Sequence, residues 1–124
     1  DRYIDVIKQL ATTHRLGIIS DIWVKSDRFY REFEKTGIRD LFDVILFSSD
    51  IGIFKPSPII FRKALEMMDA DISRVVYIGD SYRRDVIGAK TIGISVIWIK
   101  KEQTEDLNMP VEPDLIITDL QDVL

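Results

Sequence analysis

The segment 74–100, RVVYIGDSYRRDVIGAKTIGISVIWIK, constrains the fold of this chain more than any other stretch. Residues 75–78 are apolar and rich in β-branched and aromatic side chains, as in a buried strand. Apolar residues at helical spacing follow, Gly93 ends this helix, and a second apolar run covers 94–99. A strand, a short helix and a strand in this order require a parallel, right-handed crossover. The crossover places Asp80 at the carboxyl end of a strand, where open α/β sheets bind ligands.

The remaining sequence alternates helical and strand patterns. Expected helices cover residues 1–15, 28–36 (with Ser26 and Asp27 as cap and Gly37 at the end) and 57–68, and Thr118 with Gln121 predicts a capping box for a last helical turn. Expected strands cover residues 16–19, 44–47, 75–78, 94–99 and 115–117, with a polar surface loop over 101–113. This alternation predicts a doubly wound α/β fold with a mostly parallel sheet, in one domain spanning residues 1–124.

Composition excludes several function classes. The 124 residues suffice for one core, and no apolar run approaches the roughly 20 residues that cross a bilayer, so we expect no membrane partner and a cytoplasmic location. A net charge of −4 argues against nucleic acid as a partner. The chain has no cysteine, and His14 is its one histidine, so thiolate nucleophiles and cysteine or histidine metal clusters are excluded.

Polar side chains recur where the predicted strands end. Ser20 and Asp21 follow one strand and Asp80 follows another, while Lys55 and Asp85 lie just beyond. If the strands are parallel, these groups meet at one edge of the sheet. Carboxylate oxygens bind Mg²⁺, an ammonium group offsets phosphate charge, and a serine hydroxyl donates to a phosphoryl oxygen. The set is therefore suited to a phosphoryl group and a divalent cation.

Three stretches resemble motifs of the haloacid dehalogenase (HAD) superfamily, in their order along the chain. LGIISD resembles the second motif, SSDIGIFKPSPIIFRKAL the third and GDSYRRDVIGAKTIG the fourth. The resemblance implies a Rossmannoid core and, since most members are Mg²⁺-dependent phosphatases acting through a phospho-aspartate, a phosphatase-type hydrolase with Mg²⁺ as cofactor. It makes Ser20, Lys55 and Asp80 the catalytic candidates, Ser20 and Lys55 the substrate-binding candidates, and Asp80 and Asp85 the metal ligands. Asp21, which we expect first as a turn residue, is a further substrate-binding candidate by its place beside Ser20. The GDS form favours phosphatases over the metal-independent dehalogenases.

The sequence departs from this superfamily at its start. Nothing corresponds to the strand that ends in the Asp-x-Asp motif, which carries the nucleophile and the usual general acid. Asp1 and Asp5 are four residues apart on the opening helix and do not replace it. The cap segment that selects the substrate in many members is missing too. We therefore expect a truncated core that is weakly active or inactive by the aspartyl-phosphate route, with a small phosphorylated metabolite as its partner if it is active.

The missing strand would lie in the middle of the superfamily's sheet, between the strands that end at Ser20 and Gly79. Its loss leaves two strand edges with unpaired backbone groups. Three arrangements would satisfy them: direct pairing of the two strands, exchange with a second copy in a homodimer, or a separate N-terminal segment. We expect one of the first two in the isolated chain.

Two alternatives come from other function classes. The chain could be a non-catalytic oligomeric module that is indifferent to Mg²⁺, or a hydrolase that uses Asp21 as base or nucleophile. Direct pairing of the inner strands would bring Asp21 toward Asp80, and the two could then bind a cation. For the other candidates we expect structural roles: Asp50 in a turn, His14 as a polar helix residue, and Trp23 and Trp98 in core or rim packing.

Overall fold

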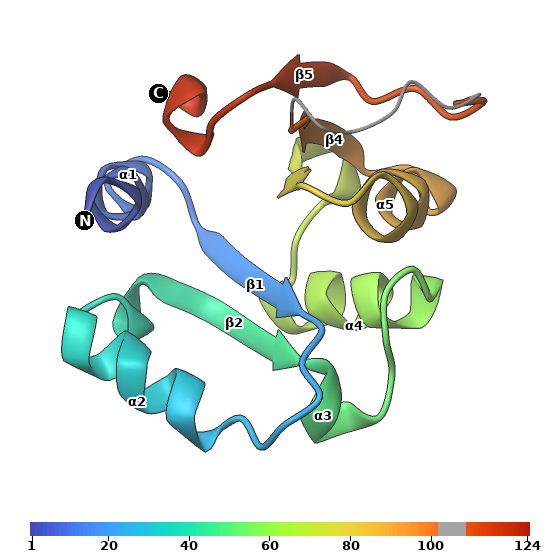
Figure 1. The fold of residues 1–124 in the computed structure, drawn as a ribbon. Helices are drawn as coiled ribbons and strands as arrows, with labels where there is room; N and C mark the ends of the chain where they lie inside the picture. The colour runs from blue at the N-terminus through green and yellow to red at the C-terminus, as the bar shows by residue number, and fades with distance from the viewer. Residues whose placement is uncertain (102–108) are drawn as a thin grey trace.

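The computed structural model describes residues 1–101 and 109–124 and shows an α/β fold with parallel strands (Figure 1). The strands are β1 (Leu16–Ser20), β2 (Phe42–Phe47), β3 (Val76–Gly79), β4 (Ser95–Ile99) and β5 (Leu115–Ile117). Every pairing among them is parallel: β1 with β2, β3 with β4, and β4 with β5. The predicted class and the predicted order of strands are confirmed.

Helices connect the strands. They are α1 (Arg2–Ala11), α2 (Asp27–Thr36), α3 (Ser48–Ile51), α4 (Pro58–Met68) and α5 (Gly88–Thr91), with short helices η1 (Arg39–Leu41), η2 (Ile72–Arg74), η3 (Tyr82–Ile87) and η4 (Leu120–Val123). Gly37 ends α2 at φ 77°, a left-handed conformation that favours glycine, as its position predicts. Ser57 caps α4 by accepting from the Ile59 amide, also as expected. In the described part of the chain, no helix is long and apolar enough to span a bilayer.

Three local expectations were wrong. Ser26 does not cap α2 with its side chain, because its hydroxyl donates to Asp50 Oδ1 at 2.7 Å instead. The last capping box joins Asp119 to Asp122 rather than Thr118 to Gln121. The helix expected after the Asp80 turn begins as a π-helix, η3, and becomes α-helical only in the single turn of α5. Part of the loop expected over 101–113, residues 102–108, lies outside the described residues.

Of the two arrangements expected for the isolated chain, direct pairing of the two inner strands does not occur; exchange with a second copy stays a prediction. Among the described residues, β1 pairs only with β2, and β3 has β4 as its one partner, so the strands form two separate sheets. Helices join the two halves instead. α4 packs against β1 and β2 and also against α5, and α1 contacts η4 near the chain ends (Figure 1). There Arg2 forms an ion pair with Asp119 at 2.8 Å.

A single buried cluster nevertheless spans both sheets. Its members are Val44 and Leu46 of β2, Ile60 and Phe61 of α4, Val86 of η3, Ala89 of α5, Ile94, and Val96 and Trp98 of β4. Fully burying one large apolar side chain stabilises a fold by about 1.5–3 kcal/mol, so this cluster holds α4 against β1 and β2, α5 against β4, and the two helices against each other. β3 is less covered, since Val76 is exposed.

Candidate functional site

The centre of the candidate site is a buried ion pair between Lys55 and Asp85. Lys55 Nζ lies 2.7 Å from Asp85 Oδ1, and the side chains are 11% and 4% exposed. Lys55 comes from the loop between α3 and α4, and Asp85 comes from η3, which follows β3. The pair therefore connects one segment that follows β2 with another that follows β3, and these strands belong to different sheets.

The local sequence around β3 allows Asp85 to approach the strand. Gly79 ends β3, and a methyl group at this position would overlap the Asp85 carboxyl group. Asp85 Oδ2 accepts from the Ser81 amide at 3.0 Å, while the Ser81 hydroxyl accepts from the Arg84 amide at 3.1 Å. The amides of both Asp85 and Val86 donate to the Ser81 carbonyl, which is the wide turn of the π-helix. Such turns occur frequently at functional sites.

Tyr77 is the third member of this buried group, and our sequence interpretation missed it. Lys55 Nζ donates to its hydroxyl at 3.2 Å, and the hydroxyl donates to Asp85 Oδ1 at 3.1 Å. Burial raises the pKa of Tyr77 well above its ordinary value of 10.0, and the Asp85 carboxylate raises it further. The phenol thus stays protonated and donates. Tyr77 and Gly79 lie two residues apart on one face of β3. This alternation in the sequence could have placed the Tyr77 side chain on the same face as the site.

The loop after β1 brings Asp21 to the same place. Asp21 Oδ1 accepts from the Lys55 amide at 3.1 Å, and Asp21 Oδ2 is buried without a hydrogen-bond partner among the described residues. Ser20 is the last residue of β1 and directly precedes this carboxylate. Ser48 fixes the loop, since its buried hydroxyl accepts from the Ile22 amide at 2.9 Å and donates to the Ile22 carbonyl at 3.1 Å.

Asp80 lies at the outer edge of the site. Its side chain is 54% exposed and forms an ion pair with Lys101 at 3.0 Å. Its backbone carbonyl accepts from Trp98 Nε1 at 3.2 Å, which anchors the turn to the core. Of the predicted residues, Asp21, Lys55 and Asp85 are joined by hydrogen bonds, whereas the Asp80 carboxylate is accessible to solvent.

No group of three Asp, Glu, His or Cys side chains in residues 1–101 and 109–124 is arranged to hold a metal. Both oxygens of Asp85 already accept hydrogen bonds, from Lys55 and Tyr77 on one side and Ser81 on the other. The cation site expected from Asp21 and Asp80 depended on direct pairing of β1 with β3, which does not occur.

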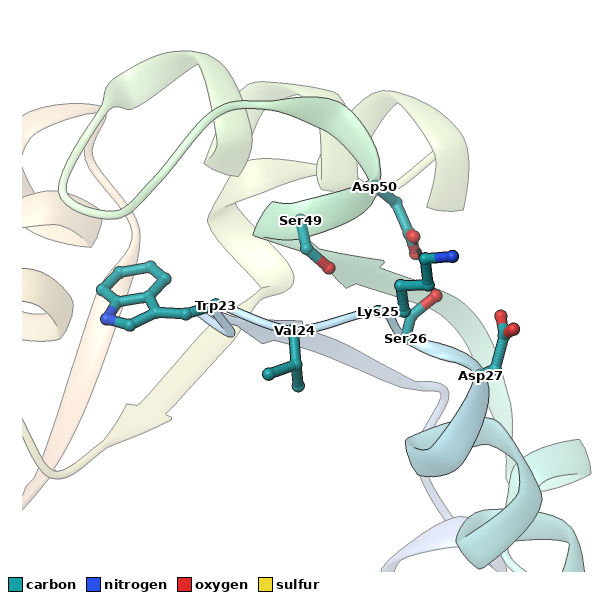
Figure 2. Close-up of a pocket in the computed structure, with 7 residues that line it drawn as sticks. All are labelled: Trp23, Val24, Lys25, Ser26, Asp27, Ser49 and Asp50. Carbon is teal, nitrogen blue, oxygen red and sulfur yellow. Dashed lines mark hydrogen bonds between the residues drawn. The ribbon is translucent and has the colours of Figure 1, made fainter.

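An open pocket of about 560 Å³ lies beside this site, at the start of α2 (Figure 2). Its lining residues are Trp23, Val24, Lys25, Ser26, Asp27, Ser49 and Asp50. None of the predicted catalytic or metal-binding residues is among them. Figure 2 shows the Trp23 ring turned away from Ser26 and Asp50, so Trp23 belongs to the rim rather than the core, whereas Trp98 is a core residue.

Comparison with known proteins identifies relatives of this chain. The family model described as haloacid dehalogenase-like hydrolase matches residues 1–99. The glyceraldehyde 3-phosphate phosphatase of Methanothermobacter thermautotrophicus is 33% identical over 112 residues, which cover 89% of this chain and 48% of that protein. The pyrimidine 5′-nucleotidase of Escherichia coli is 29% identical over 103 residues, 82% of this chain and 45% of that protein.

Solved structures agree with these relatives. The crystal structure of a HAD phosphatase from Thermococcus onnurineus superposes with a TM-score of 0.80 at 31% identity, covering 97% of this chain and 54% of that one. The chain thus spans about half the length of the relatives that it matches. These relatives are phosphatase-type hydrolases by name. Since the family model covers residues 1–99 of the 124 present, the chain belongs to the haloacid dehalogenase-like hydrolase family.

Proposed function

We propose that this chain forms one half of a Mg²⁺-dependent phosphohydrolase site, the half that binds the phosphoryl group. The observation that carries this proposal is the fixed position of Lys55. Its ammonium group has three N–H donors, and two are used within the described residues, on Asp85 and Tyr77. The third is available to a phosphoryl oxygen. Ser20, the last residue of β1, would supply a hydroxyl donor beside it.

The charges at this edge support a role for a cation. Three carboxylates, on Asp21, Asp80 and Asp85, stand against three cationic groups, so the described edge has no surplus of positive charge for a phosphate dianion; the cations are Lys55, Arg84 and Lys101. A divalent cation that accompanies the dianion would offset its charge. Mg²⁺ is commonly bound through one or two carboxylates together with the phosphate of the substrate. Asp80 would supply one such carboxylate, and the remaining ligands would come from outside this chain.

The proposal separates binding from turnover. Asp85 is held by Lys55, Asp80 is paired with Lys101, and Asp21 accepts from the Lys55 amide, so each of these three carboxylates is already engaged. Hydrolysis by the aspartyl-phosphate route therefore needs a carboxylate from another segment or chain. The relatives act on glyceraldehyde 3-phosphate and on pyrimidine 5′-nucleotides by name, which suggests a small phosphomonoester as substrate.

Binding of inorganic phosphate in the presence of Mg²⁺, measured by calorimetry, tests this proposal. We expect binding that Ser20→Ala weakens and Lys55→Met abolishes, while Arg2→Met, at the exposed pair with Asp119, leaves it unchanged. A melting curve of each variant checks that it is folded. No binding by the wild-type protein would overturn the proposal.

Turnover needs a separate assay. The pure protein should not hydrolyse p-nitrophenyl phosphate. Mg²⁺-dependent hydrolysis that Asp80→Asn abolishes would show that this chain carries its own nucleophile, and additional loss on Asp21→Ala would identify Asp21 as that group or as the base.

One observation favours a second candidate function, an oligomeric interaction module. Within the described residues, β1 and β3 each have one edge without a strand partner. Exposed edges of this kind promote association with another chain. A module of this type would associate with its partner equally with and without Mg²⁺, which distinguishes it from the phosphohydrolase half.

A further inference from the structure

The Tyr77 hydroxyl closes a triangle of hydrogen bonds at the centre of the Lys55 site. Lys55 Nζ lies 2.7 Å from Asp85 Oδ1 and 3.2 Å from the Tyr77 hydroxyl oxygen, and this hydroxyl oxygen lies 3.1 Å from Asp85 Oδ1. The ammonium group and the phenol therefore donate to the same carboxylate oxygen. As a result, Asp85 Oδ1 divides its attraction between Lys55 and a neutral donor.

Two corners of this triangle are fixed without the help of Lys55. The Asp85 carboxylate is held from its other side, where Oδ2 accepts from the Ser81 amide at 3.0 Å. The Tyr77 ring extends from β3 and packs edge-on against Phe61, with ring centroids 5.1 Å apart at an interplanar angle of 75°. Phe61 is itself 1% exposed, in the buried cluster. The core and the turn after β3 thus set the positions of the hydroxyl and the carboxylate.

Lys55 is the corner that can move. A lysine ammonium group carries three rotatable donors on a flexible four-carbon stem. A single acceptor sets its distance but lets it rotate about the axis through Nζ and that acceptor. A second acceptor away from this axis stops the rotation, and the Tyr77 hydroxyl lies in such a place. The Lys55 side chain is 11% exposed against 4% for Asp85, so the lysine keeps more contact with solvent than the carboxylate does.

We propose that Tyr77 is a positioning residue for phosphate binding, because its hydroxyl fixes the direction of the third Lys55 N–H and weakens the hold of Asp85 on the ammonium group. This inference rests on the proposed phosphate site. Tyr77 acts through Lys55 and does not touch the anion. Without the hydroxyl, Asp85 Oδ1 accepts from Lys55 alone and the ammonium group is free to turn. Phosphate binding must then reorient the ammonium group against a tighter ion pair, which lowers the affinity.

Tyr77→Phe tests this inference, since it removes the hydroxyl and keeps the ring that packs on Phe61. Calorimetry with inorganic phosphate and Mg²⁺ should show an affinity about three- to tenfold below that of the wild type, the scale of one hydrogen bond. Val44→Ala is the matched control. Val44 is a buried residue of β2 that pairs in register with Gly17, so this variant loses stability in the core without changing the triangle. Its affinity for phosphate should equal that of the wild type.

Nitrogen-15 NMR of the lysine ammonium groups adds a measurement that a loss of stability alone does not change. A buried, hydrogen-bonded ammonium group exchanges its protons with water more slowly than an exposed one, so we expect a separate Lys55 signal, which Lys55→Met would identify. This signal should shift and exchange faster in Tyr77→Phe and stay unchanged in Val44→Ala.

Three results would overturn the role of Tyr77 while phosphate binding stands. They are wild-type affinity in Tyr77→Phe, an equal loss of affinity in Val44→Ala, and a Lys55 ammonium signal that Tyr77→Phe leaves unchanged. If the wild-type protein binds no phosphate, the proposed function fails and the role of Tyr77 fails with it.

Discussion

Lys55 Nζ and Asp85 Oδ1 lie 2.7 Å apart, in an ion pair that bridges two halves of a molecule whose strands do not share a sheet. Lys55 follows β2 in the chain, and Asp85 follows β3. The pair combines two roles. It fixes the position of the Lys55 ammonium group in the site, and it links the loop before α4 to η3.

Breaking this pair should strongly destabilise the protein. Removing one partner of a buried pair leaves an uncompensated charge and costs about 3–5 kcal/mol. We expect Lys55→Met or Asp85→Asn to lower the free energy of unfolding in urea by this amount, and the double variant to lose less than the sum. Lys101→Met removes an exposed pair with Asp80, which contributes about 0–1 kcal/mol. A single variant at the buried pair as stable as Lys101→Met would contradict this account.

Gly79→Ala should disturb the same pair through the backbone. The added methyl would meet the Asp85 side chain and displace its carboxylate from Lys55. Overpacking at such a position costs about 1–3 kcal/mol, and the lost ion pair adds to it. Urea unfolding and phosphate calorimetry would measure both effects.

Gly17→Ala is the matched control for this substitution. Its methyl would meet the Met68 thioether at 2.8 Å, which is the end of a flexible side chain that can move aside. It should cost less stability than Gly79→Ala and leave phosphate binding intact. If both variants lost the same amount of stability and of phosphate affinity, the cause would be the replacement of a strand glycine in general, not the close contact between Gly79 and Asp85.

The order of elements was predictable because local signals fix it. Gly37 takes a left-handed conformation after α2, and Ser57 with Pro58 starts α4. Gly93, with φ 88°, ends the crossover helix. Each signal depends on the chemistry of one or two residues, which the sequence states directly.

The pairing of strands and the membership of the site were less predictable, because both depend on distant residues. Whether β1 pairs with β3 depends on how the rest of the chain packs around the two strands, and the residues of the strands alone do not determine this. Tyr77 has the composition of a strand residue, and its role appears only when Lys55, 22 positions away, reaches its hydroxyl. Asp21, Lys55 and Asp85 were named from sequence, but their mutual hydrogen bonds were not.

Acid should remove a contribution of Asp114 to stability. Its carboxylate accepts from the Val96 amide at 2.7 Å and from Lys90 at 3.0 Å, and these bonds hold the pKa of Asp114 below its ordinary value of 3.8. A lowered folded pKa stabilises the folded state above the unfolded pKa. That stability is lost as the pH falls through the folded pKa.

The pH dependence of urea unfolding for the wild type and Asp114→Asn would measure this contribution. The wild-type advantage should be constant well above pH 3.8 and shrink progressively below it. Asp71 is another exposed carboxylate with a lowered pKa. The Asp114→Asn variant keeps Asp71, so its stability should still fall in acid by the contribution of Asp71. A wild-type advantage that persists at the lowest pH would contradict the assignment.

Mg²⁺ alone should not stabilise the protein. A ligand raises the melting temperature only when its concentration exceeds its dissociation constant for the folded state. Three metal-binding side chains do not come together among the described residues, and Asp80 is paired with Lys101. We expect a flat melting temperature in a Mg²⁺ titration and an increase when inorganic phosphate is added with it. A saturable increase with Mg²⁺ alone, lost in Asp80→Asn, would mean that Asp80 has further ligands within this chain.

The unpaired edges of β1 and β3 predict self-association. Their backbone amide and carbonyl groups lack strand partners in the described structure, and Val76 exposes an apolar side chain on β3. Pairing with a second copy would satisfy these groups. We expect light scattering to show a dimer or larger species at micromolar concentration. Val76→Lys should shift it toward monomer, since lysine on an edge strand opposes pairing.

Leu115→Lys is the matched control for this prediction, because Leu115 is equally exposed on β5, at the opposite edge of the same sheet. If association runs through the inner edges, this variant should remain associated while Val76→Lys does not. A shift to monomer only in Leu115→Lys would move the interface to β5. If the wild type is a monomer at every concentration, the free edges of β1 and β3 would instead pair with a strand from a different segment. Adding such a segment should then raise the melting temperature, because it supplies the missing hydrogen bonds.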